Sequence, residues 1–92
     1  DWFAMKLSNQ ILRIQVSGDA SFNQLFKPVF MKYACSYELI AVDSIQSGSL
    51  TELVYPVGLK KPDFADAFIA EIKKLNNNKP VSLVKGYNGS DL

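Results

Sequence analysis

The sequence predicts one α+β domain, in which two helices alternate with four strands along the chain. Short stretches of alternating apolar and polar residues are typical of half-buried strands, and two longer stretches repeat apolar residues at helical spacing. Glycine, proline, serine or asparagine separates most of these stretches. With 92 residues, 48% of them hydrophobic, the chain is long enough to bury one compact core.

The first strand and first helix are predicted on either side of a Ser-Gly-Asp turn at residues 17–19. The strand covers residues 10–16, and its buried face is expected to consist of Leu12, Ile14 and Val16. Asp19 or Ser21 is expected to cap the helix that follows. One side of this helix carries the apolar residues Phe22, Leu25, Phe26, Val29, Phe30 and Tyr33. Because proline removes a backbone donor and clashes with the preceding turn, we expect a kink or a reset of the helix at Pro28.

A β-hairpin is predicted next, from two aliphatic stretches at residues 37–46 and 50–60. A short link containing glycine joins them, which is typical of a hairpin. Pro56 lies inside the second stretch and cannot donate to a strand ladder, so we expect a bulge or an unpaired position there.

The second helix is expected to begin at Asp63, a good cap residue, and to end at the asparagines 76–78. Its apolar side consists of Phe64, Ala65, Phe68, Ile69, Ile72 and Leu75. A last strand follows at residues 80–85. The complete order is β-α-β-β-α-β, and right-handed crossovers then predict a ferredoxin-like sandwich. We expect a four-stranded antiparallel sheet of order 4-1-3-2, with both helices on one face.

The predicted domain covers residues 8–85. Residues 1–7 form an N-terminal flank, and residues 86–92 form a C-terminal tail. The longest apolar stretches contain about four residues, so no direct insertion of this fragment into a membrane is expected. Because the chain begins at Asp1, we expect a fragment of a larger protein.

Composition limits the function more than any motif does. The chain has no histidine, which removes the usual general base near neutral pH and histidine-ligated metals. Its one cysteine, Cys35, forms neither an internal disulfide nor a multi-thiolate site, and we expect a buried, inert thiol in a cytoplasmic protein. A net charge of +1 argues against nucleic-acid binding. We therefore expect no enzymatic activity, no metal and no cofactor.

A family resemblance rests on three features of the sequence: the stretch Leu53-Val-Tyr-Pro-Val-Gly-Leu-Lys60, the later Val81-Ser82-Leu83, and the glycine at Gly18. Over about residues 8–85 the chain resembles ACT-like domains, and especially the C-terminal cytoplasmic domains of MgtC-type and similar bacterial membrane proteins. The resemblance implies a ferredoxin-like regulatory module that senses small molecules and pairs sheet to sheet. It also implies a location at the cytoplasmic face of a membrane-anchored parent protein.

Two candidate sites follow from the predicted fold. Ser17, Gly18 and Asp19 form a candidate ligand site, because the start of the next helix attracts anions; a capped turn without a ligand is the alternative. The sheet face without helices is a candidate interface, with Ile11, Arg13 and Tyr55 as its residues. The strands carry more apolar residues than one buried face needs, which favours a homodimer or docking on another domain.

The sequence thus predicts a non-enzymatic regulatory or oligomerisation domain that associates through its open sheet face. The alternative is a free-standing small-molecule sensor with its site at the first strand–helix turn. Neither the ligand nor the partner can be named from the residues.

Overall fold

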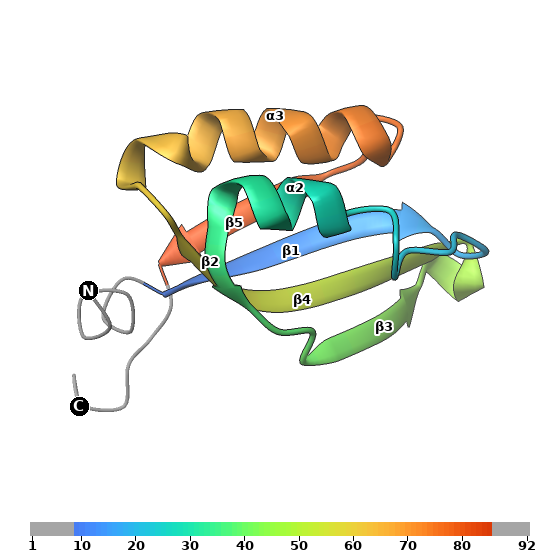
Figure 1. The fold of residues 1–92 in the computed structure, drawn as a ribbon. Coiled ribbons are helices and arrows are strands. Elements are labelled where there is room, and N and C mark those ends of the chain that lie inside the picture. The colour runs from blue at the N-terminus through green and yellow to red at the C-terminus, as the bar shows by residue number, and fades with distance from the viewer. Residues whose placement is uncertain (1–8, 86–92) are drawn as a thin grey trace, which may run out of the picture.

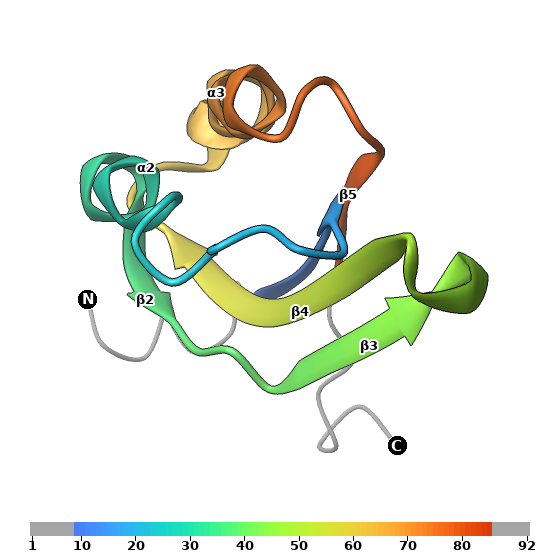
Figure 2. The same cartoon turned by 90° about the vertical axis from the view of Figure 1, so that its right-hand side faces the viewer.

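The computed structural model describes residues 9–85, and the predicted flank and tail lie outside this range. The strands are β1 (Gln10–Ser17), β2 (Ala34–Tyr37), β3 (Ala41–Ile45), β4 (Leu50–Leu59) and β5 (Val81–Lys85). The helices are α2 (Lys27–Tyr33) and α3 (Ala65–Leu75), and two short 3-10 turns are η1 (Gln46–Gly48) and η2 (Pro62–Phe64). Both α-helices lie on the same face of the sheet (Figures 1 and 2).

The sheet has five antiparallel strands in the order β2-β4-β1-β5, and β3 pairs with β4 on the same side as β2. The strand count therefore differs from the predicted four, and the order as numbered along the chain differs from 4-1-3-2; with β2 and β3 taken together as the second strand, the neighbours are those predicted. The difference arises because the predicted strand 37–46 is interrupted: β2 pairs with Val57–Leu59 of β4, and β3 pairs with Leu50–Val54.

The interruption lies opposite Pro56, where the sequence predicts a bulge or an unpaired position. Residues 38–40 run along β4 outside regular strand pairing, held by two backbone bonds. Glu38 N–H donates to the carbonyl of Pro56 at 3.2 Å, and Ile40 N–H donates to that of Val54 at 2.9 Å. On the other side of β4, Pro56 pairs in regular register with Ile11 of β1. Pro56 is thus accommodated in the central strand β4 because the adjacent segment, residues 38–40, does not pair regularly with it.

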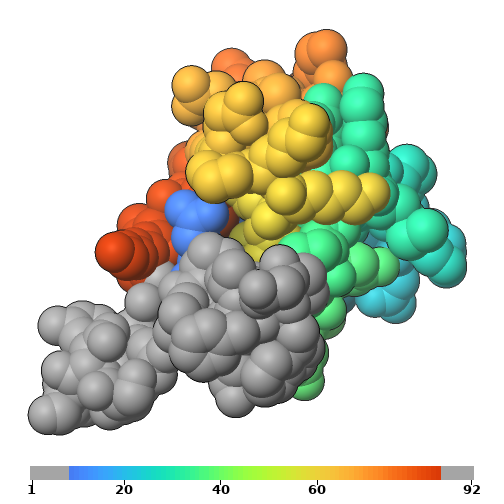
Figure 3. Space-filling model, turned by 60° about the vertical axis from the view of Figure 1, so that its left-hand side comes forward, coloured from blue at the N-terminus to red at the C-terminus, as the bar shows by residue number. Residues whose placement is uncertain are grey.

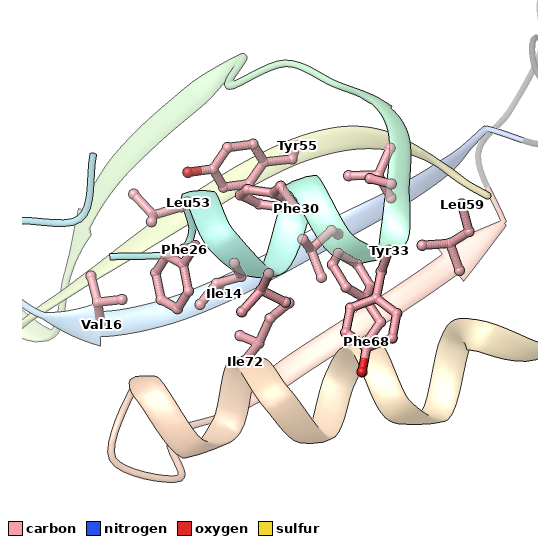
Figure 4. Packing of buried hydrophobic residues seen from close by; sticks show 14 residues of the cluster. Ile14, Val16, Phe26, Phe30, Tyr33, Leu53, Tyr55, Leu59, Phe68 and Ile72 are labelled. Carbon is pink, nitrogen blue, oxygen red and sulfur yellow. The ribbon is translucent and has the colours of Figure 1, made fainter. Parts of the chain in front are cut away.

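The core lies between the sheet and the two helices (Figure 4). The predicted face of β1 is confirmed, since Leu12 and Ile14 are fully buried and Val16 is 2% exposed. Phe30 of α2 lies at the centre of an aromatic cluster. Its ring centroid is 4.5 Å from Tyr37, 4.8 Å from Tyr55 and 5.8 Å from Phe68 of α3. The cluster joins both helices to the sheet.

The first helix is shorter than predicted, because it starts beside Pro28; of the two expected effects of this proline, the structure shows the reset and not the kink. Helix α2 begins at Lys27, with Pro28 in its first turn, where the missing N–H has no intrahelical partner to lose. Residues 18–26 form turns and loop, so neither Asp19 nor Ser21 caps the helix. Phe22, Leu25 and Phe26 nevertheless pack on the core, as their spacing predicts.

Helix α3 ends where the asparagines predict, and Asn76 attaches that end to the sheet. Asn76 is 4% exposed, and its Nδ2 donates to the carbonyls of Gln15 at 2.8 Å and Lys79 at 3.2 Å. Asn77 and Asn78 both have φ of 60°, the left-handed conformation that asparagine tolerates. At the other end, Asp63 lies in η2 and caps no helix through its side chain.

Candidate functional site

The Ser17–Asp19 turn is tied to the β3–β4 connection. Gly18 N–H donates to the carbonyl of Ser49 at 3.1 Å. A Cβ at Gly18 would lie 2.1 Å from the Gly48 carbonyl oxygen, so glycine is required by this close approach. Ser17 Oγ donates to the Asp19 carboxylate, and this bond lowers the pKa of Asp19. The local groups satisfy one another, and the following helix begins only at Lys27.

The three predicted interface residues do not lie together. Ile11 and Arg13 point to the sheet face without helices, and Arg13 forms an ion pair with Glu52 at 3.6 Å. Tyr55 pairs with Leu12, so it points to the opposite face, packs against Phe30 and is 6% exposed. The sheet therefore separates Tyr55 from the other two residues.

Exposed apolar side chains gather at the β2–β3 edge of the sheet. Among residues 9–85, seven large hydrophobic side chains are exposed, and four of them are Tyr37, Leu39, Ile40 and Val42. Ile40 is 57% and Val42 50% exposed. Strand β3 is paired on one side by β4, so alternate backbone N–H and C=O groups on its outer side are unpaired within the described chain. We refer to residues 36–45 as the β3 edge.

An aromatic groove lies beside the β3 edge, between it and the chain that leads into α2. Its volume is about 360 Å³. Its apolar walls are formed by Phe22, Phe26, Phe30, Tyr37, Leu39 and Tyr55. Asn23, Gln24, Lys27 and Glu38 line its polar rim.

Tyr55 contributes a buried hydroxyl-bearing ring to the groove. Burial raises its pKa, and the neighbouring Tyr37 hydroxyl adds to the effect. The Tyr55 hydroxyl therefore stays neutral well above physiological pH and remains a hydrogen-bond donor.

Cys35 differs from its prediction. It lies on β2, past the end of α2, and is exposed instead of buried. Its Sγ is 3.3 Å from the carbonyl oxygen of Gly58. Because α2 ends at Tyr33, Cys35 falls on β2 where the pairing with β4 is irregular, and its Sγ also lies 3.8 Å from the carbonyl oxygen of Leu59.

Residues 9–85 contain no group of three or more metal-ligating side chains close enough to share an ion. In the same part of the chain, no helix has both the length and the apolar character to cross a membrane.

Sequence reasoning missed the β3 edge and the groove as sites. The signal for the edge was present in Leu39-Ile-Ala-Val42, a continuous apolar run that one buried strand face does not require. The groove left no such signal, because its walls come from segments far apart in the sequence.

The comparisons with known proteins add no relative: no family model matches the chain, and no curated protein or solved structure is significantly similar to it.

Proposed function

We propose that this chain is a non-enzymatic association domain whose β3 edge pairs with a strand of a second copy. One observation carries the proposal: four of the seven exposed large apolar side chains in residues 9–85 lie within six positions of one sheet edge. An edge with unpaired backbone groups and exposed apolar side chains is a template for strand addition. The absence of histidine from the sequence supports association over acid–base catalysis.

The edge is a better candidate than the open sheet face that the sequence predicts. On that face Arg13 and Glu52 form an ion pair, and Val54, the residue that pairs with Arg13, is only 5% exposed. Within residues 9–85, the large hydrophobic side chain that is more than a third exposed on this face is Val84 of β5, which pairs with Ile11. Stacking two such faces would bury charged groups and cover few apolar ones, which gives little net stabilisation.

The proposal also includes a regulatory role for the domain within a larger protein and a cytoplasmic location. The resemblance of residues 53–60 and 81–83 to ACT-like domains supports a regulatory role within a larger bacterial protein. A single exposed thiol, Cys35, is compatible with the reducing cytoplasm.

The double substitution Ile40→Lys/Val42→Lys is expected to abolish self-association without unfolding the domain. Both side chains are at least half exposed, so lysine is tolerated in the monomer, while two buried charges oppose strand pairing. Sedimentation velocity from about 1 µM to about 1 mM measures the effect. The unmodified chain should associate within this range, and the variant should sediment at its 10.3 kDa monomer mass.

The matched control is Met31→Lys/Leu75→Lys, which adds the same charge at two exposed apolar residues of the helices. It should associate as the unmodified chain does. An unmodified chain that stays monomeric, or an edge variant that associates like the control, contradicts the proposal.

The aromatic groove favours a second candidate function, the binding of a small aromatic molecule. Its volume of about 360 Å³ is in the range of small-molecule sites, and its walls are largely aromatic with the neutral Tyr55 hydroxyl among them. This candidate replaces the Ser17–Asp19 turn as the location of the predicted sensor site, because that turn is filled by its own contacts.

Thermal unfolding in the presence of phenol or indole tests this candidate. A molecule that binds the native state raises the melting temperature. Tyr55→Phe should lose most of the rise with phenol, because the hydroxyl that holds the ligand is gone. Tyr33→Phe should keep it, since Tyr33 is buried outside the groove. No rise with either molecule would rule out this function.

A further inference from the structure

We infer that the strand that pairs with the β3 edge is β5 of the next copy, so that the chain assembles head to tail into an extended sheet. This inference rests on the proposed function and names the other half of the interface. It follows from the positions of the two sheet edges, their lengths and their opposite charges.

The two edges lie on opposite sides of the molecule. The strand order places β5 at one end of the sheet and β2 with β3 at the other. Figure 3 shows β5 in red and the green segment that contains β2 at the surface on opposite sides. One copy therefore presents both edges at once to two neighbours.

Strand β5 provides a second accessible edge of matching length. Both β3 and β5 contain five residues. Within the described residues β5 pairs with β1 alone, so its outer side is unpaired. Val84 is 51% exposed and Ser82 is exposed, so nothing in the described chain covers this strand.

The two edges carry opposite charges at both ends. The β3 edge has Glu38 before its apolar run and Asp43 after it, and no lysine or arginine lies within residues 36–45. Strand β5 has Lys79 before it and Lys85 at its end, and no acidic residue lies between them. None of these four side chains forms an ion pair inside residues 9–85.

Strand direction brings the opposite charges together. Because every neighbouring pair in the sheet is antiparallel, β3 and β5 run in opposite directions within one copy. A neighbour added in the same orientation places its β3 antiparallel to β5. Lys85 then lies near Glu38 of the neighbour, and Lys79 lies near Asp43. Apolar residues of both strands meet between these ends.

Symmetric pairing of like edges is opposed by the same charges. Antiparallel pairing of β3 with a second β3 brings Glu38 against Asp43, and pairing of two β5 strands brings Lys79 against Lys85. Head-to-tail pairing avoids both repulsions. Such a heterologous contact leaves a free edge at each end, so it produces open chains or rings of copies and not a closed dimer.

Two charge-reversed variants test the inference. Glu38→Lys/Asp43→Lys makes both edges basic, and Lys79→Glu/Lys85→Glu makes both edges acidic. Each alone should associate about tenfold or more weakly than the unmodified chain, because two attractive pairs become repulsive. An equimolar mixture should recover association, since every basic edge then meets an acidic one. Light scattering measures the mass in each sample.

Asp63→Lys/Asp66→Lys is the control, because it makes the same change in net charge as Glu38→Lys/Asp43→Lys but lies in η2 and α3, outside both edge strands. It should associate like the unmodified chain. Raising the salt from about 0.1 M to about 1 M should weaken the association of the unmodified chain and of the mixture.

The outcomes separate this inference from the proposed function. A closed dimer that is lost in Ile40→Lys/Val42→Lys but is unaffected by Lys79→Glu/Lys85→Glu supports the β3 edge and overturns its pairing with β5. A mixture that associates no better than its components also overturns the inference. A monomeric unmodified chain overturns both.

Discussion

Phe30→Ala is expected to destabilise the domain by about 3–5 kcal/mol. Phe30 is 2% exposed, and its ring contacts the rings of Tyr37, Tyr55 and Phe68. Truncation therefore leaves a cavity between both helices and the sheet. Since small domains have about 5–15 kcal/mol of total stability, the variant should lose a large part of it. Its melting temperature should fall by roughly 15–30 °C.

The adjacent Met31→Ala is the control for this prediction. Met31 belongs to the same helix but is 61% exposed, so its truncation should change stability by less than about 0.5 kcal/mol. Urea unfolding of the two variants gives the comparison. A loss below about 1 kcal/mol for Phe30→Ala would contradict the central position of this ring in the core.

Asn76→Asp is expected to cost roughly 3 kcal/mol or more near neutral pH. The Nδ2 of Asn76 donates to two carbonyl groups, Gln15 of β1 and Lys79 before β5. An ionised carboxylate in the same buried place has no donor to offer and faces two acceptors. The attachment of the α3 end to the sheet should then be lost.

Asn77→Asp gives the matched comparison, because the same chemical change is made one residue later on an exposed side chain. Aspartate also tolerates the left-handed conformation found at residue 77. Its effect on the free energy of unfolding should stay below about 0.5 kcal/mol. Equal losses in the two variants would show that the hydrogen bonds of Asn76 do not hold the helix end.

The parts of the fold that depend on local patterns could be predicted from the sequence. Alternation along residues 10–16 identifies both the strand β1 and its buried face, because a strand with one covered face requires that alternation. The end of α3 at the asparagines follows from their preference for the left-handed conformation.

Features that depend on a competition between local and long-range contacts could not be predicted from the sequence. Phe22, Leu25 and Phe26 have helical spacing, yet they pack on the core from a loop, because Pro28 fixes the start of α2. The division of one predicted strand into β2 and β3 depends on Pro56 in a partner strand that comes later in the sequence.

The candidate site was harder still to predict from the sequence, because its residues come together only in the assembled sheet. The sequence predicts Tyr55 on the open face, whereas its pairing with Leu12 places it on the helix face. The opposite charges of β3 and β5 are readable in the sequence. These charges indicate complementary edges only once the strand order is known to place the two strands at opposite edges of the sheet.

The most direct test of the central claim is the molecular mass of the unmodified chain as its concentration is raised from about 1 µM to about 1 mM. Association through two complementary edges predicts a mass that starts at 10.3 kDa and continues to increase beyond that of a dimer. A mass that remains at 10.3 kDa throughout would contradict the account.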